Sequence, residues 1–269
     1  AARRPHFDLE QRAELGELAA LDIDTEATPA ELAACLVKIK ASWSHLGAVS
    51  PHFSVLTNKK FLPDNIAEAL DDFWATGRSQ AELTVRILER HGLSLSGKTC
   101  VEYGCGVGRV TTSLSRSFAR IDAYDISPNH LALARQRALE LGVGNVRFHE
   151  CAVDSIVDLE PCDAFYSRFV FQHNPPPVIT ELTRNALRAL KPDGIAVFQI
   201  PTYISGYHFS LPEWLGSEQL ADIQMHCLPQ SKVFALIAEL RCDLLEVRED
   251  DATGARGRMV SNTFVARKA

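Results

Sequence analysis

The chain has 269 residues, of which 46% are hydrophobic and 23% are charged, and its formal net charge is −6 at pH 7. This composition is typical of a globular protein, and the length suits one large α/β domain or one domain with a smaller appendage. The acidic balance disfavours nucleic acid as a substrate, because proteins that bind a phosphate backbone normally carry excess Lys and Arg. No run of about 18 apolar residues is present, which predicts that no segment spans a membrane.

Seven cysteines are spread along the chain. Their number is odd and no two have the Cys-x-x-Cys spacing, so we expect buried, reduced thiols and no zinc or other metal site. Residues 1–5 lead into a charged stretch rather than an apolar one, which predicts that the chain has no secretory signal. Together these features predict a cytoplasmic location.

The first 95 residues have the apolar periodicity of helices. One helix is expected to begin after Thr28, a favourable N-cap, with Pro29 at its first position. Further helices are predicted over 7–21, 63–74 and 79–91. The segment 51–57 is too short and too mixed in residue type to assign. We expect residues 1–95 to form a helical cap, whose candidate wall residues are Trp43, His45, His52, Trp74 and Arg78.

Residues 96–269 alternate between short apolar strands and helices. Strands are predicted over 99–103, 121–124, 145–149, 163–167, 195–200, 244–248 and 259–267. Helices are predicted from a glycine turn to about 118, and over 128–141, 178–190 and 230–240. This α/β alternation predicts a Rossmann-like, doubly wound, mainly parallel seven-stranded sheet. No helix separates the last two strands, so they should form an antiparallel hairpin, and the segment 201–229 is predicted to be a lid-like insertion.

A glycine-rich turn follows the first of these strands and opens a helix. It has glycines at 104, 106 and 108, preceded by Glu102 and followed by Arg109. Glycines let the backbone approach a ligand, and the start of a helix offers free N–H groups and the positive end of its dipole. The dinucleotide-binding pattern Gly-x-Gly-x-x-Gly needs a glycine where this chain has Arg109, so the spacing disfavours a nicotinamide cofactor.

The segment Glu102-x-Gly104-x-Gly106-x-Gly108 resembles motif I of the class I S-adenosylmethionine-dependent methyltransferases. Asp125 lies at the end of the second strand, where that family has an acid for the ribose hydroxyls. A carboxylate in that place can accept two hydrogen bonds from a vicinal diol.

Two later segments, 163–167 and 190–194, resemble further motifs of the same family in the right order, so the resemblance covers about residues 98–269. It implies S-adenosyl-L-methionine as the cofactor and S-adenosyl-L-homocysteine as the product. The acid that often binds adenine after the third strand is absent, and the backbone of Ala152 is the nearest substitute. The cofactor site implied by the resemblance consists of Glu102, Gly104, Gly106, Gly108, Arg109, Asp125, Ile126, Ala152 and Ser167.

Methyl transfer requires a nucleophile aligned with the methyl group and, for a hydroxyl, a base that removes its proton. His173 follows the fourth strand and is predicted to face the carboxyl edge of the sheet, so it is either the base or a residue that shapes the pocket. In the insertion, Tyr203, Tyr207 and His208 are candidate substrate-binding residues for a small polar acceptor.

The sequence therefore predicts a methyltransferase that acts on the hydroxyl of a small molecule or saccharide. Three alternatives stay open: N-methylation of a natural product or metabolite, an NAD-dependent oxidoreductase, and a non-catalytic module that binds S-adenosylmethionine. The sequence does not determine an oligomeric state.

Overall fold

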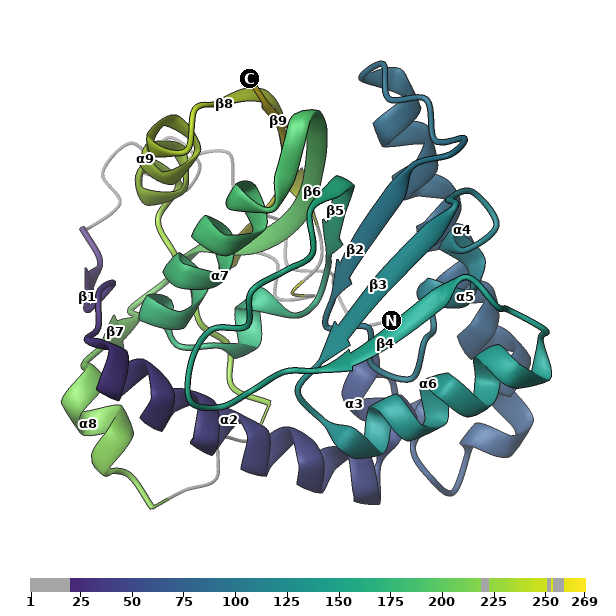
Figure 1. Ribbon diagram of the computed structural model, residues 1–269. Coiled ribbons are helices and arrows are strands. Elements are labelled where there is room, and N and C mark those ends of the chain that lie inside the picture. The colour runs from purple at the N-terminus through teal and green to yellow at the C-terminus, as the bar shows by residue number, and fades with distance from the viewer. Residues whose placement is uncertain (1–19, 219–222, 251–252, 254–258) are drawn as a thin grey trace, which may run out of the picture.

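A seven-stranded sheet forms the centre of the molecule, in the order β4-β3-β2-β5-β6-β9-β8 (Figure 1). The computed structural model describes residues 20–218, 223–250, 253 and 259–269, so most of the helix predicted over 7–21 lies outside the described residues. The strands are β2 (Thr99–Tyr103), β3 (Arg120–Asp125), β4 (Val146–Glu150), β5 (Cys162–Ser167), β6 (Leu190–Ile204), β8 (Cys242–Asp250) and β9 (Met259–Lys268). Strands β2 to β6 pair in parallel, and β9 runs antiparallel to β6 and β8. The predicted Rossmann-like sheet with a C-terminal hairpin is confirmed.

Two clusters of buried apolar side chains hold helices against the sheet. One cluster packs α7 (Pro176–Arg188) and α9 (Gln230–Glu239), together with the N-terminal α2 (Pro29–Val49). The other packs α5 (Thr111–Leu114) and α6 (Pro128–Glu140). With apolar clusters on both faces, the parallel strands leave only their ends open to a ligand.

The N-terminal region lies across the carboxyl ends of the parallel strands (Figure 1). Its long helix α2 begins as predicted, because the Thr28 hydroxyl accepts a hydrogen bond from the Glu31 N–H at 3.3 Å and the Glu31 carboxylate accepts one from the Thr28 N–H at 2.8 Å. The segment that the sequence left unassigned forms the short helix α3 (Pro51–Val55). A turn of 3₁₀ helix, η2 (Lys59–Phe61), follows it.

The two helices predicted over 63–74 and 79–91 are one continuous helix, α4 (Ile66–Arg90). Gly77 lies in its middle and does not interrupt it. A Cβ atom at Gly77 would lie 2.0 Å from the backbone oxygen of Arg109. The glycine is therefore explained by the close approach of α4 to the loop after β2, rather than by a break in the helix.

The helix predicted to follow the glycine turn as far as 118 is shorter than expected. Only α5 is helical there, and residues 115–117 form turns. The helix predicted over 178–190 ends close to the expected place, because α7 stops at Arg188. The next strand begins earlier than predicted: residues 191–194 already belong to β6, at an irregularity in its pairing with β5, where Asp193 adopts a φ of 62°. The seven cysteines are buried and free, as predicted.

Residues 201–204 of the predicted insertion 201–229 belong to β6, and two elements described after them pack against the N-terminal region. The strand β7 (His208–Phe209) pairs in parallel with β1 (Asp22–Ile23), and a short helix, α8 (Leu211–Gly216), follows. Lys38 on α2 donates a hydrogen bond to the backbone oxygen at the middle of α8, at 2.6 Å. Among the described residues, no helix is both long enough and apolar enough to cross a membrane.

Candidate active site

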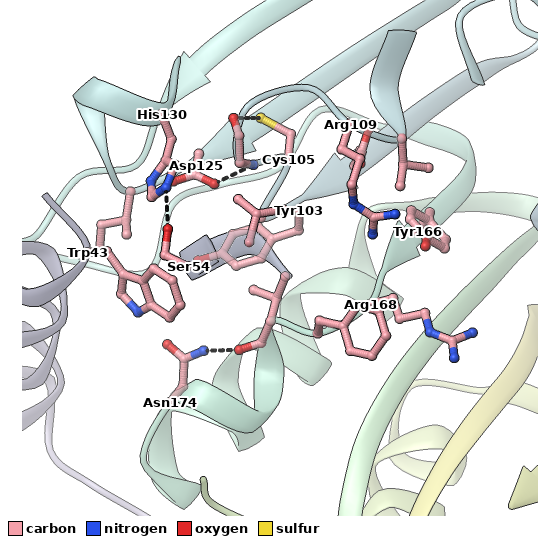
Figure 2. A pocket seen from close by; sticks show the side chains of 18 of the residues that line it. Trp43, Ser54, Tyr103, Cys105, Arg109, Asp125, His130, Tyr166, Arg168 and Asn174 are labelled. Carbon is pink, nitrogen blue, oxygen red and sulfur yellow. Dashed lines mark hydrogen bonds between the residues drawn. The ribbon is translucent and has the colours of Figure 1, made fainter. Parts of the chain in front are cut away.

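A pocket lies at the carboxyl ends of β2, β3 and β5, beneath α2 and α3 (Figure 2). It encloses about 840 Å³, part of which is open to solvent. The strand order reverses between β2 and β5, and open α/β sheets bind their ligands at such a point. The walls come from the N-terminal region, from the loops after β2 and β3, and from the loop after β5.

The glycine turn approaches its surroundings too closely for any side chain. Gly104 and Gly106 adopt positive φ angles of 76° and 54°. A Cβ atom at Gly104 would lie 2.2 Å from a methyl carbon of Val170, and one at Gly106 would lie 2.6 Å from a methyl carbon of Val55. Both conformation and space therefore require glycine at these two positions.

Glu102 and Arg109 are two buried ionisable residues beside the turn. Glu102 is 3% exposed, and its Oε2 atom has no hydrogen-bond partner among the described residues. Burial raises the pKa of Glu102 to about 7, against the opposing effect of the Arg109 charge. Arg109 donates from Nη1 to the Thr76 hydroxyl at 3.1 Å, while its Nε atom is buried without a partner in the described chain. Beside the glycine turn, the pocket thus presents one acceptor, on Glu102, and one donor, on Arg109, that are free to bind a ligand.

Asp125 at the end of β3 connects the glycine turn to α6. One carboxylate oxygen accepts a hydrogen bond from the Gly106 N–H at 2.8 Å, and the other accepts one from the Ser127 N–H at 2.9 Å. Ser127 in turn caps α6, as the sequence predicted. Each carboxylate oxygen has a second lone pair, so Asp125 can hold the turn and still accept hydrogen bonds from a ligand.

The predicted cofactor residues separate into two groups. Those that line the pocket are Glu102, Gly104, Gly106, Arg109, Asp125 and Ile126. The other three do not line it. Gly108 packs on α6, where a Cβ atom would lie 3.3 Å from that of Ala134; Ala152 is exposed beyond β4; and the Ser167 hydroxyl donates to the Tyr103 oxygen at 2.9 Å.

The roof of the pocket, which is the part of its wall that comes from the N-terminal region, agrees only partly with the prediction. Of the candidate wall residues, Trp43 lines the pocket, together with Ser54 and Val55 of α3. Ser54 hydrogen-bonds His130 of α6 at 2.9 Å, and both side chains line the cavity (Figure 2). Burial lowers the pKa of His130. No local pattern marks Ser54 or His130, because their meeting depends on how α3 lies over α6.

His173 lies behind the pocket wall rather than among the residues that line it. Its Nδ1 atom is 2.9 Å from the backbone oxygen of Gln224, and its Nε2 atom is 3.1 Å from the side-chain nitrogen of Gln172. Burial lowers the pKa of His173 to about 4. Its ring packs against Trp43 with a centroid distance of 5.3 Å. The histidine is therefore neutral, with both nitrogens engaged, and supports a residue that does line the pocket.

The candidate substrate residues of the insertion do not line this pocket. The Tyr207 hydroxyl hydrogen-bonds His226 at 2.6 Å. His208 is exposed and lies 3.2 Å from Asp22 across the β1–β7 pair. Tyr203 is half-buried on β6, opposite Val260 of β9. The three side chains thus contact the insertion itself, the N-terminal region and the sheet, respectively, rather than the cavity.

Comparison with known proteins agrees with this architecture. Residues 100–194 match the family model of a methyltransferase domain. The chain is 33% identical over 114 residues to a ubiquinone biosynthesis O-methyltransferase of Sodalis glossinidius (strain morsitans), a match that spans 42% of this chain and 44% of that protein. The chain thus matches less than half the length of this curated relative.

Solved structures share the fold at low sequence identity. Magnesium protoporphyrin IX methyltransferase from Synechocystis, crystallised with S-adenosylhomocysteine, superimposes with a TM-score of 0.61 at 13% identity, covering 87% of this chain and 99% of that chain. The [4+2]-cyclase SpnF superimposes with a TM-score of 0.53 at 19% identity, covering 70% and 81% of the two chains.

The family match over residues 100–194, the glycine turn and the fold together support a class I S-adenosylmethionine-dependent methyltransferase domain, a class whose cofactor is S-adenosylmethionine. This match disfavours the alternative of an NAD-dependent oxidoreductase. The comparisons leave the acceptor and the atom that is methylated undefined.

Proposed function

We propose that the protein transfers the methyl group of S-adenosylmethionine to a hydroxyl oxygen of a small molecule. The observation that carries the proposal is the pocket itself, in which a buried carboxylate with one unpaired oxygen and two glycines without room for a side chain meet at the carboxyl edge of the sheet. The name of the curated relative, an O-methyltransferase, supports oxygen as the acceptor atom.

The residues of the pocket fit the cofactor. The free acceptor of Glu102 suits an ammonium group, and the free Nε donor of Arg109 suits a carboxylate, so the two are matched to the amino-acid end of S-adenosylmethionine. Asp125 retains lone pairs for the ribose hydroxyls. When bound, the cofactor supplies an electrophilic methyl group on a sulfonium sulfur.

The chain contributes orientation and exclusion of water. Trp43 and Val55 close the pocket from the N-terminal side, and Phe169 and Val170 close it from the side of β5. These four apolar side chains favour an apolar acceptor over a heavily hydroxylated saccharide. Holding the acceptor in line with the methyl group in a closed site lowers the entropic part of the barrier.

The base that removes the hydroxyl proton remains a prediction. For His173 we propose a positioning role, because both ring nitrogens are engaged and the side chain reaches the pocket only through Trp43. Proton removal by His173 would require its hydrogen bond with Gln172 to break in the complex.

The proposal is tested by mass spectrometry of methylated products, with phenols, aliphatic alcohols, amines and saccharides as acceptors. We expect S-adenosylhomocysteine to form with phenols or alcohols and to be absent when the acceptor is omitted. Asp125→Ala should abolish measurable S-adenosylhomocysteine binding in calorimetry. Products methylated only on nitrogen would favour the N-methylation alternative. Tight cofactor binding without turnover of any acceptor class would favour a non-methylating role on this fold, and absence of cofactor binding would refute the proposal.

A further inference from the structure

Arg168 is a cation of the pocket that has no anionic partner among the described residues. It comes directly after β5 and lines the cavity. Its guanidinium lies over the ring of Phe169, 4.9 Å from the centroid, and its Nε atom is buried without a hydrogen-bond partner in the described chain. A buried donor of a charged group costs free energy when it is unpaired, so we expect a ligand to accept a hydrogen bond from this atom.

A second unpaired polar atom lies close by. The Tyr166 side chain is 4% exposed, and its hydroxyl makes no well-aligned hydrogen bond in the described chain. Burial raises the pKa of this hydroxyl, and the neighbouring Thr84 side chain is among the groups that oppose the rise. Figure 2 shows Arg109, Tyr166 and Arg168 on the same side of the pocket, away from Trp43 and His130. The three groups also influence one another electrostatically: burial lowers the pKa of Arg109, and the positive charge of Arg168 adds to that effect. One side of the cavity is therefore rich in donors that the chain itself leaves free.

The loop that carries Arg168 is held in a conformation that costs free energy. Phe169 has a φ of 62°, which is unfavourable for a residue with a large side chain. Its N–H donates to the Gln199 side chain at 3.1 Å, and the Val170 oxygen accepts from the Asn174 side chain at 2.8 Å. These bonds maintain the strained turn, which is typical of loops that present functional groups.

The charges that line the pocket indicate that Arg168 binds a group other than the cofactor. The ionisable acids and arginines that line the pocket are Glu102, Asp125, Arg109 and Arg168. With both acids ionised, which an ammonium group bound beside Glu102 favours, their charges sum to zero. Since burial lowers the pKa of His130, it adds no charge near neutral pH. S-adenosylmethionine carries two positive charges and one negative charge, and its single carboxylate can be matched by Arg109. One positive charge, with Arg168 as its nearest free donor, is then left for the acceptor to balance.

We propose that Arg168 and Tyr166 form a carboxylate-binding subsite for the methyl acceptor, so that the substrate is an apolar molecule with one carboxylate and a hydroxyl to be methylated. This inference rests on the proposed function. A guanidinium fork and a phenol hydroxyl match the two oxygens of a carboxylate. A single uncompensated positive charge favours a monoanion over a dianionic phosphate.

The test is calorimetry on the complex of the protein with sinefungin, an unreactive analogue of S-adenosylmethionine that carries an ammonium group in place of the methyl sulfonium and so keeps its positive charge. The probes are hydroxybenzoate, hydroxycinnamate and hydroxynaphthoate, each compared with its own carboxamide, which has the same shape and no charge. We expect at least one carboxylate to bind about tenfold or more tightly than its carboxamide, as a charge-assisted hydrogen bond predicts. Arg168→Gln should remove this preference, Arg168→Lys should keep part of it, and Tyr166→Phe should reduce it.

The matched control is Arg116→Gln, because Arg116 is exposed and outside the pocket. It should leave both the preference and the affinity for S-adenosylhomocysteine unchanged. Equal affinities within every probe pair, or no binding of any probe, would overturn the subsite. So would a variant Arg168→Gln that weakens S-adenosylhomocysteine as much as the probes, since Arg168 would then belong to the cofactor site. Failure of the wild type to bind S-adenosylhomocysteine would instead refute the proposed function.

Discussion

The two sides of the pocket differ in how their polar groups are satisfied. On the side of β3, both oxygens of Asp125 already accept backbone N–H groups, and those bonds also set the glycine turn. On the side of β5, Tyr166 and Arg168 present donors with no partner in the described chain. The hydrogen bonds of Asp125 on the first side form when the protein folds, whereas those of Tyr166 and Arg168 on the second side form only when a ligand binds.

This difference separates two kinds of substitution. Changes on the β3 side should alter stability and cofactor affinity together, because the same atoms serve both. Changes on the β5 side should alter ligand selectivity and leave the fold intact. Four predictions for other groups around the pocket extend this contrast between folding and ligand binding, in order of decreasing effect.

Gly104→Ala should have the largest effect. The new methyl group meets Val170 at 2.2 Å in a backbone with a φ of 76°, so we expect a loss of about 2–4 kcal/mol in the free energy of unfolding and of more than about 100-fold in cofactor affinity. Gly97→Ala is the matched control, because Gly97 has a φ of 73° with no atom within 4 Å of the added Cβ. It should lose about 1–2 kcal/mol and retain S-adenosylhomocysteine binding. Equal binding losses in the two variants would contradict close approach as the cause.

Glu102→Gln should affect the ligand-free and bound protein in opposite directions. Burial raises the pKa of Glu102 to about 7 from a usual value of 4.5, so the folded protein holds this proton to higher pH than the unfolded chain does. The stability contributed by Glu102 is therefore present below about pH 4.5 and is lost as the pH rises through 7. Relative to wild type, the melting temperature of the ligand-free variant should be higher at pH 8 than at pH 5.

The same variant should bind S-adenosylhomocysteine about tenfold or more weakly at pH 8, because the amide cannot match an ammonium group as the carboxylate does. A variant whose melting temperature differs from wild type equally at pH 5 and pH 8 would show that Glu102 does not titrate in this range.

His173→Gln should reduce turnover only a few-fold if the histidine positions Trp43. Burial lowers the pKa of His173 to about 4, and that of His226 to about 3, from the usual 6.5. Their stabilising contribution is present above pH 6.5 and is lost as the pH falls toward 4. The acid-side decrease in melting temperature should therefore be shallower in the variant. A loss of turnover above about 100-fold with an unchanged Michaelis constant would instead identify His173 as the base.

Ser54→Ala should have the smallest effect. It removes the hydrogen bond with His130 that ties α3 to α6, and leaves a buried ring nitrogen unpaired. We expect a loss of about 1–2 kcal/mol in the free energy of unfolding and a few-fold decrease in cofactor affinity. Ser44→Ala, elsewhere on the N-terminal region and outside the pocket, is a suitable control. A variant with wild-type stability would show that the roof is held by apolar packing alone.

Much of the cofactor side could be predicted from the sequence because its signals are local. The glycine turn, the acid at the end of β3 and the Ser127 cap with Pro128 all lie within a few residues of the strand or helix that positions them. Their geometry follows from backbone conformation and hydrogen bonding over short distances along the chain. The C-terminal hairpin is also predicted by a local signal, because no helix is predicted between the last two strands.

The residues that complete the pocket could not be predicted in this way. Nothing near Ser54 or His130 indicates that they meet, and their separation is 76 residues. Tyr207 and His208 lie in a segment with the composition of a binding loop, yet the β1–β7 pair holds His208 against the N-terminal region and Tyr207 hydrogen-bonds His226.

The sequence by itself determined the parallel sheet, its C-terminal hairpin and the turn at Gly104 and Gly106, because each depends on local periodicity or on a conformation that only glycine adopts readily. Only the tertiary structure decided that α2 and α3 form the roof, that His173 lies behind Trp43, and that Tyr166 and Arg168 leave donors free in the pocket. These features depend on burial and on contacts between segments distant in the chain, and side-chain packing and electrostatics settle them only once the whole core has formed.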